Sequence, residues 1–229
     1  MHPRLVRKTI LIASAAVTLG GVLFLGWDIR TILFLYWLEN VLLGVIQLIK
    51  MLTASGEGET RASWRAKLAV AAFFSLHYGG FCAIHGLFII VLSSSMFGTG
   101  GNPDHAGRIL SDAADPFGPW IFLTILWGVL KEVARLLPPG AWLALAGIAA
   151  GHVVDLVNGY FIKGGRKAGL LGKLMTEPYK HIVVVHIGII AGAFLTLLFK
   201  NAIGVLAIIV IGKLLLDLRE AAAPAKSEA

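Results

Sequence analysis

The stretch TILFLYWLENVLLGVIQLIKML, residues 31–52, decides the fold class of this chain. Its charged residues are Glu39 and Lys50, and nearly all the others are apolar. A helix over such a stretch rises roughly 33 Å at ~1.5 Å per residue, enough to cross the ~30 Å hydrocarbon core of a bilayer. Residues 31–52 therefore predict a membrane-spanning helix.

The rest of the chain repeats this pattern. Of its 229 residues, 57% are hydrophobic and 14% are charged, and the mean hydropathy is +0.81, which is too apolar for a water-soluble domain of this length. The sequence predicts an all-α, polytopic transmembrane helix bundle with about seven spanning helices. We expect one transmembrane domain over residues 1–220 and a disordered C-terminal tail at 221–229. The helices are expected at residues 8–26, 31–52, 67–95, 117–137, 141–162, 179–199 and 202–218.

The loops indicate an orientation. Strict alternation of seven crossings puts most basic loop residues on one side, which the positive-inside rule makes cytoplasmic. We therefore expect the cell inner membrane, with a cytoplasmic N-terminus. The basic loop at 163–180 then falls on the opposite side, so either one block is a re-entrant hairpin or this loop is an exception. Seven simple crossings are the favoured interpretation, with 97–116 as the longest connection. The basic residues on the first side are Arg4, Arg7, Lys8, Arg61, Arg65, Lys67, Lys131 and Arg135.

Residues 163–175 differ from the other loops because Lys163, Arg166, Lys167 and Lys173 alternate with leucines and a methionine. This pattern favours a basic amphipathic segment in the headgroup layer, in contact with anionic lipid. A solvated basic loop is the alternative interpretation. The net charge of +7 comes from such membrane-flanking positions, so the expected partners are membrane lipids, and no nucleic acid is expected. The oligomeric state is left open.

Ionisable residues inside spanning helices are costly and are candidates for function. His2 and His105 fall outside the predicted helices, whereas the other histidines fall inside. At ~1.5 Å per residue, Glu39 lies about 12–15 Å from one membrane face, and His85 and His152 lie about 15 Å from the same face. On the same scale Asp155 and His186 lie about 10 Å deep. The polar residues predicted within helices are Glu39, Asn40, His77, His85, His152, Asp155, Asn158, His181, His186, Lys213 and Asp217.

This shared depth predicts an intramembrane metal site, because imidazoles and carboxylates are natural ligands of zinc and iron. The first ligand candidates are His85, His152 and His186, and His77 and His181 are further candidates. Glu39 or Asp155 would be a fourth ligand or a catalytic base. The pair Lys213 and Asp217, four residues apart, is expected to form an ion pair. Such a site suggests a metal-dependent hydrolase acting on a lipid or other amphipathic substrate, although an enzyme is not established by these residues alone.

Other functions fit the same residues. Two of the histidines could ligate a b-type haem in a redox protein that also binds quinone. Glu39, Asp155 and Lys213 could carry protons in a coupled transporter. A purely structural role is the remaining alternative, in which buried groups pair with each other, for example Glu39 with Lys213.

Several sequence strings resemble an uncharacterised prokaryotic multi-pass membrane family, a domain of unknown function. The resemblance covers the second to seventh predicted helices and implies that the polar positions matter, but it implies no particular activity. The strings are Tyr36-Trp37-Leu38-Glu39-Asn40, His77-Tyr78-Gly79-Gly80-Phe81 followed by His85-Gly86, Pro178-Tyr179-Lys180-His181 followed by His186, and Lys213 with Asp217.

Overall fold

The computed structural model describes residues 3–56, 62–96, 104–114, 120–168 and 171–179, together with Val183, Gly212 and Leu215. In this part of the chain all regular secondary structure is helical. The predicted helices at 179–199 and 202–218 and the tail at 221–229 lie almost wholly outside the described residues. The elements are α1 (Pro3–Phe24), α2 (Ile29–Thr53), α3 (Trp64–Met96), α4 (Asp104–Ala114), α5 (Ile121–Leu136), α6 (Pro139–Asp155), the π-helical segment η2 (Leu156–Ile162), α7 (Gly165–Ala168) and α8 (Leu171–Thr176).

Three of these stretches are long and apolar enough to cross a membrane: Arg30–Thr53, Trp64–Leu92 and Pro139–Ile162. They match the predicted helices at 31–52, 67–95 and 141–162. The all-helical fold class of the prediction is thereby confirmed, whereas the count of about seven crossings is not established by the described residues.

The turn between α1 and α2 is set by two residues. Gly26 has φ of +64°, a left-handed conformation that a glycine adopts without steric cost. Asp28 caps α2, because its carboxylate accepts hydrogen bonds from the Thr31 amide at 2.9 Å and from the Thr31 hydroxyl at 2.8 Å. Arg30 lies 3.3 Å from the same carboxylate. The polar step between the first two apolar blocks is therefore a helix cap.

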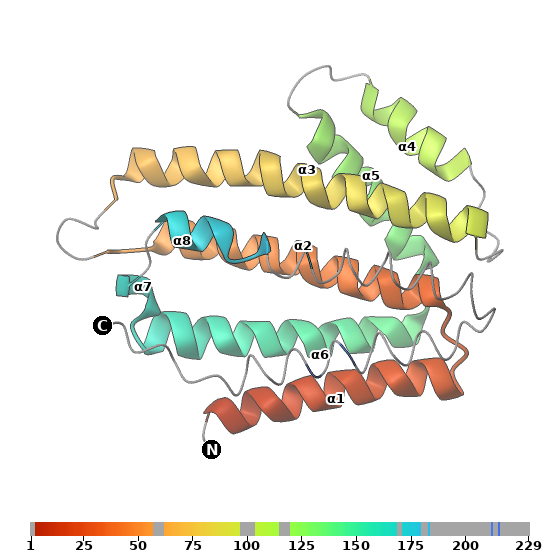
Figure 1. Cartoon of the computed structure of the whole chain (residues 1–229), viewed down its shortest axis with the longest axis horizontal. Helices are drawn as coiled ribbons and strands as arrows, with labels where there is room; N and C mark the ends of the chain where they lie inside the picture. The colour runs from red at the N-terminus through yellow and green to blue at the C-terminus, as the bar shows by residue number, and fades with distance from the viewer. Residues whose placement is uncertain are drawn as a thin grey trace.

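Four long helices form a layer in the order α3, α2, α6, α1 (Figure 1). Since α2 lies between α3 and α6, its first half is almost completely buried, and Ile32, Phe34 and Leu35 are each 0% exposed. A helix that is apolar all round and buried on two sides is typical of the interior of a membrane bundle. The central position of α2 brings Glu39 into the interior of the molecule.

Close packing joins α2 to α3. The side chain of Trp37 is buried, and its indole N–H donates to the Cys82 carbonyl at 2.8 Å. Gly86 makes room for this ring, because a Cβ at that position would lie 2.7 Å from Trp37 and 2.5 Å from Val129. Helix association in membranes depends on such close van der Waals contact, which small residues permit.

The segment between α3 and α6 differs from the prediction. The expected connection at 97–116 contains the helix α4, so His105 is helical. Ile109 of α4 packs on Gly128 of α5, and His105 pairs with Glu132, so α4 and α5 form an antiparallel helical hairpin. Apolar residues on one side of α4 explain this packing. They are Ala106, Ile109 and Ala113, all buried.

The α4–α5 hairpin reaches only halfway along α3. A Cβ at Gly80, near the middle of α3, would lie 3.2 Å from Phe122 at the start of α5. One to two turns later along α3, Gly86 faces Val129 of α5. Therefore α5 begins beside the midpoint of α3 and runs towards the same end. At 117–137, where one crossing was expected, the structure has the 16-residue helix α5, which runs towards the end of the bundle from which α4 departs.

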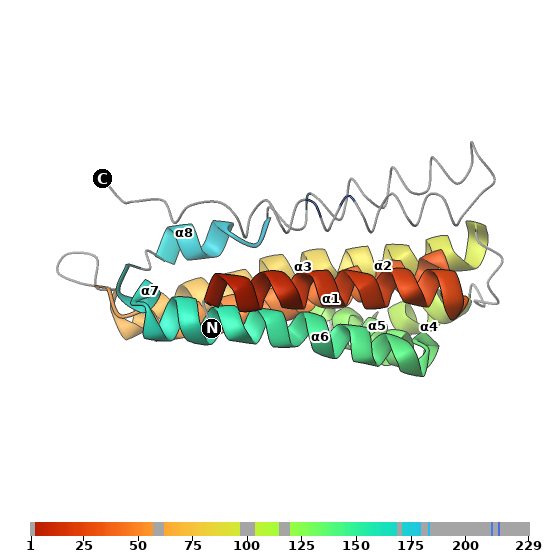
Figure 2. The same cartoon turned by 90° about the horizontal axis from the view of Figure 1, so that it is seen from below.

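The basic segment folds back onto the end of α2. The side-chain amide of Gln47 donates to the Leu174 carbonyl, and Leu174 itself is buried. The amide of Ser55 donates to the Arg166 carbonyl at 3.0 Å. Figure 2 shows α8 outside the layer of long helices, against one of its faces. Residues 163–175 thus contain two short helices, α7 and α8, and in the described part of this segment Leu174 is buried whereas Lys163, Arg166 and Lys173 are exposed.

Candidate functional site

Two of the predicted site residues meet between α2 and α6. The Nε2 atom of His152 lies 2.9 Å from Oε1 of Glu39. Their side chains are 17% and 8% exposed, respectively. Both belong to stretches that are long and apolar enough to span a membrane. We call this contact the Glu39–His152 pair.

The direction of Glu39 follows from its neighbours on α2. Trp37 binds the Cys82 carbonyl of α3, and the Asn40 carbonyl accepts from the Tyr78 hydroxyl of α3 at 2.9 Å. At about 100° per residue, Glu39 points about 160° from Trp37 around the helix axis, and so away from α3. The α3 contacts on either side of Glu39 therefore turn its carboxylate towards α6.

An apolar stripe continues the same face of α2. Ile46 packs with Leu156 and Tyr160, and Leu42 lies against this cluster. Residues 39, 42 and 46 follow the i, i+3, i+7 spacing of one helix face. The Tyr160 hydroxyl completes the contact by donating to the Lys50 carbonyl at 2.6 Å. The Glu39–His152 pair thus lies next to an apolar stripe in the interface between α2 and the α6–η2 stretch.

Burial of both side chains favours a hydrogen bond between Glu39 and His152. A carboxylate removed from water loses several kcal/mol of solvation, and a partner with a proton recovers much of it. An ionised Glu39 can only accept, so Nε2 of His152 then carries the hydrogen and the lone pair of a neutral His152 is on Nδ1. Glu39 also takes part in at least one further interaction.

His85 lies at a similar level on α3. Its neighbour Gly86 packs against Trp37, two residues before Glu39. The Nδ1 atom of His85 lies 2.9 Å from the Phe81 carbonyl, and its ring stacks on Phe81 with centroids 4.1 Å apart. A carbonyl oxygen only accepts, so Nδ1 carries the hydrogen. The lone pair of neutral His85 is therefore on Nε2.

Asp155 follows His152 on the same side of α6 and is partly buried. It has at least one interaction of its own. Directly after it the helix widens into the π-helical segment η2, where the backbone amide of Lys163 donates to the Asn158 carbonyl at 3.0 Å. Such π-helical turns are rare and occur frequently at functional sites. The predicted polar stripe of α6 therefore ends in an irregular part of the helix.

His77 has a different environment. Its side chain is exposed, and Nδ1 forms a hydrogen bond with the Tyr179 hydroxyl. The ring also stacks on Phe73, with centroids 5.5 Å apart. These contacts connect α3 to the end of the basic segment.

The remaining predicted residues His181, His186, Lys213 and Asp217 lie outside the described residues. Within the described ranges no group of three or more His, Cys, Asp or Glu side chains is placed to hold a metal ion. Of the predicted ligands and bases, the structure therefore brings Glu39 and His152 together, whereas His85 contacts Phe81 and His77 contacts Tyr179 and Phe73.

A second buried carboxylate was absent from the sequence interpretation. Glu132 of α5 has an 8% exposed side chain, pairs with His105 of α4 and lies 3.7 Å from Arg135. A signal was present, because Ala106, Ile109 and Ala113 follow a helical spacing directly after His105. This cluster fastens the α4–α5 hairpin at the edge of the bundle.

Comparison with known proteins adds one family and no activity. A family model described as a family of unknown function, DUF6498, matches residues 2–229. No curated protein and no solved structure matches the chain.

Proposed function

Because the chain belongs to the DUF6498 family, whose function is unknown, we propose its function from the site: an integral membrane protein that binds a divalent transition metal between its spanning helices. His85 and His152 are the proposed ligands from the described residues. Zinc or iron is the proposed metal, and hydrolysis of a lipid or other amphipathic substrate is the proposed reaction.

The observation that carries this proposal is the state of the two imidazoles. His152 has one ring nitrogen on the Glu39 carboxylate, and His85 has one on the Phe81 carbonyl. Metal-ligating histidines almost always have such an oxygen acceptor on the nitrogen that does not bind the metal, because it fixes the tautomer and the ring orientation. We propose that each histidine binds the metal through its other ring nitrogen, Nδ1 of His152 and Nε2 of His85.

The third ligand is proposed to be His186, with His181 as the alternative. Both lie outside the described residues, and a site of two described histidines needs at least one more donor. A bound divalent metal with an open position lowers the pKa of a water molecule towards neutrality. Glu39 would orient His152, and Asp155 is the proposed proton acceptor. A site among spanning helices suits a substrate with an acyl chain.

We expect the purified protein to contain about one equivalent of zinc or iron, measured by inductively coupled plasma mass spectrometry after size exclusion. His85→Ala and His152→Ala should each remove it. Glu39→Gln should retain the metal with roughly 10- to 100-fold weaker affinity, since loss of an outer-shell partner typically costs this much.

The matched control is His105→Ala, since His105 is likewise paired with a buried glutamate but lies at the bundle edge. It should retain the metal of the unaltered protein. Substoichiometric metal in the unaltered protein, or full metal in both site variants, would contradict the proposal. A visible spectrum of the same sample tests the haem alternative, because a Soret band would assign the histidines to haem instead.

Proton-coupled transport is the second candidate, and the Glu39–His152 pair also favours it. A carboxylate and an imidazole in hydrogen-bond contact can pass one proton between two spanning helices, and Asp155 follows three residues after His152 on the same helix. In this function the pair would titrate during a transport cycle and would hold no metal.

In liposomes loaded with a pH-sensitive dye, transport would appear as proton flux driven by an imposed pH gradient. We expect Glu39→Gln to reduce that flux at least tenfold, because the amide has no proton to exchange. Glu177→Gln, an exposed carboxylate at the end of the bundle, is the matched control. Equal flux in Glu39→Gln and the unaltered protein would exclude this function for the pair.

A further inference from the structure

Cations from separate stretches of the chain gather at one end of the bundle. The ammonium of Lys67 donates to the Ala54 carbonyl, and Nε of Arg166 donates to the Thr53 carbonyl. These contacts join the end of α2 to the start of α3 and to α7. We call this region the basic end. Its described cations are Lys50, Arg65, Lys67, Lys163, Arg166 and Lys173.

The start of α1 belongs to the same end. Trp27, just after α1, packs against Gly140 at the start of α6. The C-terminal end of α1 therefore lies beside the N-terminal end of α6, at the end of the bundle opposite the basic end. Since α1 is 22 residues long, its first turns lie about 33 Å away, near the basic end. The positions of Arg4, Arg7 and Lys8 fall in those turns.

The returning α4–α5 hairpin explains why this arrangement differs from strict alternation. With α5 counted as a crossing, the basic segment at 163–175 would lie opposite the start of α1. Because α5 returns to the end from which α4 departs, α6 starts there and finishes at the basic end. The structure therefore places the basic segment beside the end of α2, on the side that the positive-inside rule makes cytoplasmic, and corrects the expected side of Lys131 and Arg135, which lie at the opposite end.

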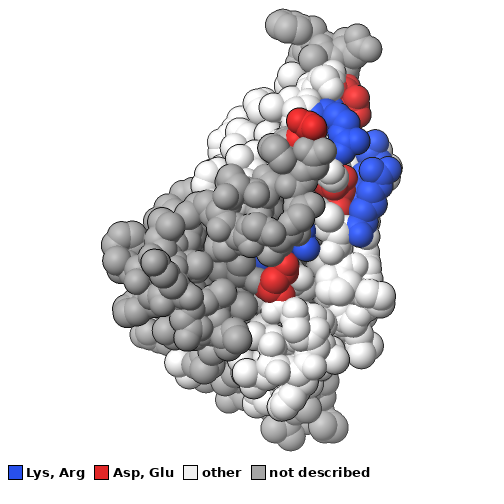
Figure 3. Space-filling view, turned by 90° about the vertical axis from the view of Figure 1, so that its right-hand side faces the viewer, with Lys and Arg blue, Asp and Glu red and all other residues white. Residues whose placement is uncertain are grey.

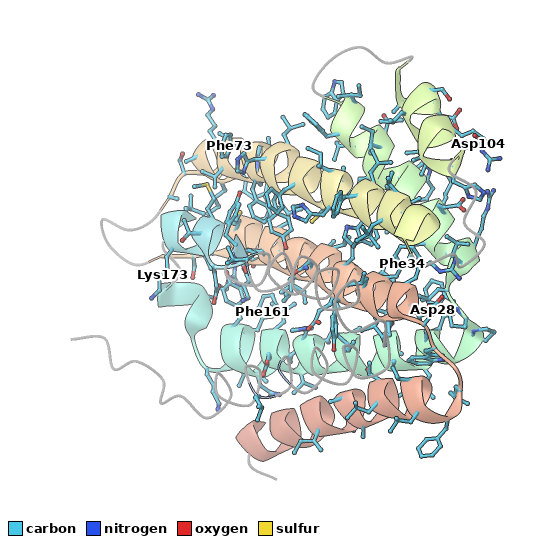
Figure 4. All side chains as sticks on the ribbon, turned by 45° about the vertical axis from the view of Figure 1, so that its right-hand side comes forward. Asp28, Phe34, Phe73, Asp104, Phe161 and Lys173 are labelled. Carbon is cyan, nitrogen blue, oxygen red and sulfur yellow. The ribbon has the colours of Figure 1, made fainter. Side chains whose placement is uncertain are left out.

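The two ends carry different charge. Among the described side chains at the basic end the acidic residue is Glu177, which lies 3.7 Å from Lys50. At the opposite end acidic and basic side chains alternate, as Figure 3 shows. Figure 4 places Lys173 at the basic end and Asp28 and Asp104 at the opposite end. The described charged residues of that opposite end are Asp28, Arg30, Asp104, Arg108, Asp112, Lys131, Glu132 and Arg135.

The surroundings of the cations are those of a membrane interface. Trp64, Phe161 and Ile162 are 59%, 42% and 69% exposed, and all three are beside the cations in sequence. Aromatic and apolar side chains at this level contact the acyl boundary, while lysine and arginine extend to the phosphates. Arg166 and Lys67 are also anchored to backbone carbonyls, which limits the freedom that a bound headgroup would otherwise remove.

We infer that the basic end lies against the anionic cytoplasmic leaflet and binds the phosphate groups of anionic phospholipids. The combination of an uneven charge, anchored cations and exposed apolar neighbours selects a lipid over a soluble anion. Clusters of juxtamembrane cations attract anionic lipid in this way, and each cation contributes to the affinity. This inference does not depend on the metal site.

The test uses the full-length protein in a zwitterionic detergent, titrated with phosphatidylglycerol and read by native mass spectrometry. Lys163→Gln/Lys173→Gln should weaken the apparent affinity by roughly tenfold or more, as expected for two interfacial cations. The matched control, Arg108→Gln/Lys131→Gln, neutralises two exposed cations at the opposite end and should change the apparent affinity for phosphatidylglycerol less than twofold. Equal weakening in both variants would overturn the inference.

Two further experiments test whether the ligand is a lipid or a soluble anion, and on which side of the membrane the basic end lies. Inorganic phosphate at the same concentration should not displace the lipid, and full displacement would indicate a soluble-anion site instead. In a Cys82→Ala background, an impermeant maleimide should label Ser111→Cys in intact cells and Thr176→Cys only after permeabilisation. Both native hydroxyls are exposed and bind a carbonyl of their own helix, so the two probes are matched. The reverse labelling would overturn the cytoplasmic assignment.

Discussion

Glu39→Ala and His152→Ala should each destabilise the bundle, and the two changes should be strongly non-additive. Each single change leaves one buried polar group without the partner that compensates its loss of hydration. A hydrogen bond that involves a charged group contributes about 1.5–3 kcal/mol, so we expect a coupling energy in that range. The double variant should therefore be more stable than the sum of the single changes predicts.

Reversible unfolding in mixed micelles, followed by circular dichroism, measures all four proteins of this cycle. Glu39→Gln should be milder than Glu39→Ala, because the amide oxygen still accepts from Nε2 of His152. A cycle between Glu39 and His77 is the control, because His77 binds the Tyr179 hydroxyl instead. If the Glu39 and His152 changes add to within about 0.5 kcal/mol, the contact does not stabilise the fold.

The sequence predicts the long helices well because their signal is local. The apolar blocks at 31–52, 67–95 and 141–162 coincide with α2, α3 and the combined α6 and η2 to within a few residues. The length of such a block and the near-absence of charge follow from the bilayer itself, without reference to neighbouring helices. The depth estimate that grouped Glu39 with His152 relied on the same regular geometry.

The α4–α5 hairpin was not predictable in the same way. Residues 117–137 form an apolar block as long as a crossing, so the sequence alone indicates a spanning helix. The level along α3 at which α5 begins is shown by the contacts of Phe122 and Val129 with α3. The 11 residues of α4 include Gly107 and form a short helix that is marginal in isolation. Packing of Ile109 on Gly128 and the pairing of His105 with Glu132 stabilise it.

The choice of partner for Glu39 was also beyond the sequence. Shared depth indicates a layer of polar residues, but the pairing depends on how each helix is rotated. The rotation of α2 is fixed by two contacts with α3, in which Trp37 of α2 donates to the Cys82 carbonyl and Tyr78 of α3 donates to the Asn40 carbonyl. No spacing rule predicts these contacts. The predicted roles of His181, His186, Lys213 and Asp217 remain predictions, because these residues lie outside the described ranges.

Gly86→Ala should destabilise the protein by about 1–3 kcal/mol, and Gly86→Leu should prevent it from folding. A methyl group at this position would lie 2.5 Å from Val129 and 2.7 Å from the Trp37 ring, well inside van der Waals contact. Neither neighbour can yield easily, because both are buried and the Trp37 indole is held by the Cys82 carbonyl. The helix propensity gained by alanine, about 0.5–1 kcal/mol, offsets only part of this cost.

The control is Gly20→Ala, since a Cβ there would meet no atom within 4 Å and the same propensity gain should appear without a clash. Adding Val129→Ala to Gly86→Ala should recover part of the lost stability, because it removes one of the two colliding groups. Unfolding free energies of the four variants in the same micelles test this expectation. If Gly86→Ala is as stable as Gly20→Ala, the close approach of α2, α3 and α5 at this level is wrong.

The same substitution also tests how the site is positioned. Trp37 is two residues from Glu39, and its contact with α3 turns the Glu39 carboxylate towards His152. Displacement of the ring by the new methyl group should therefore rotate or shift α2 and lengthen the Glu39–His152 contact. Gly86→Ala should then weaken the coupling energy between Glu39 and His152 even where the protein remains folded, whereas Gly20→Ala should leave that coupling unchanged. Because Gly86 has no side chain, such a loss can be attributed only to the packing that orients the pair.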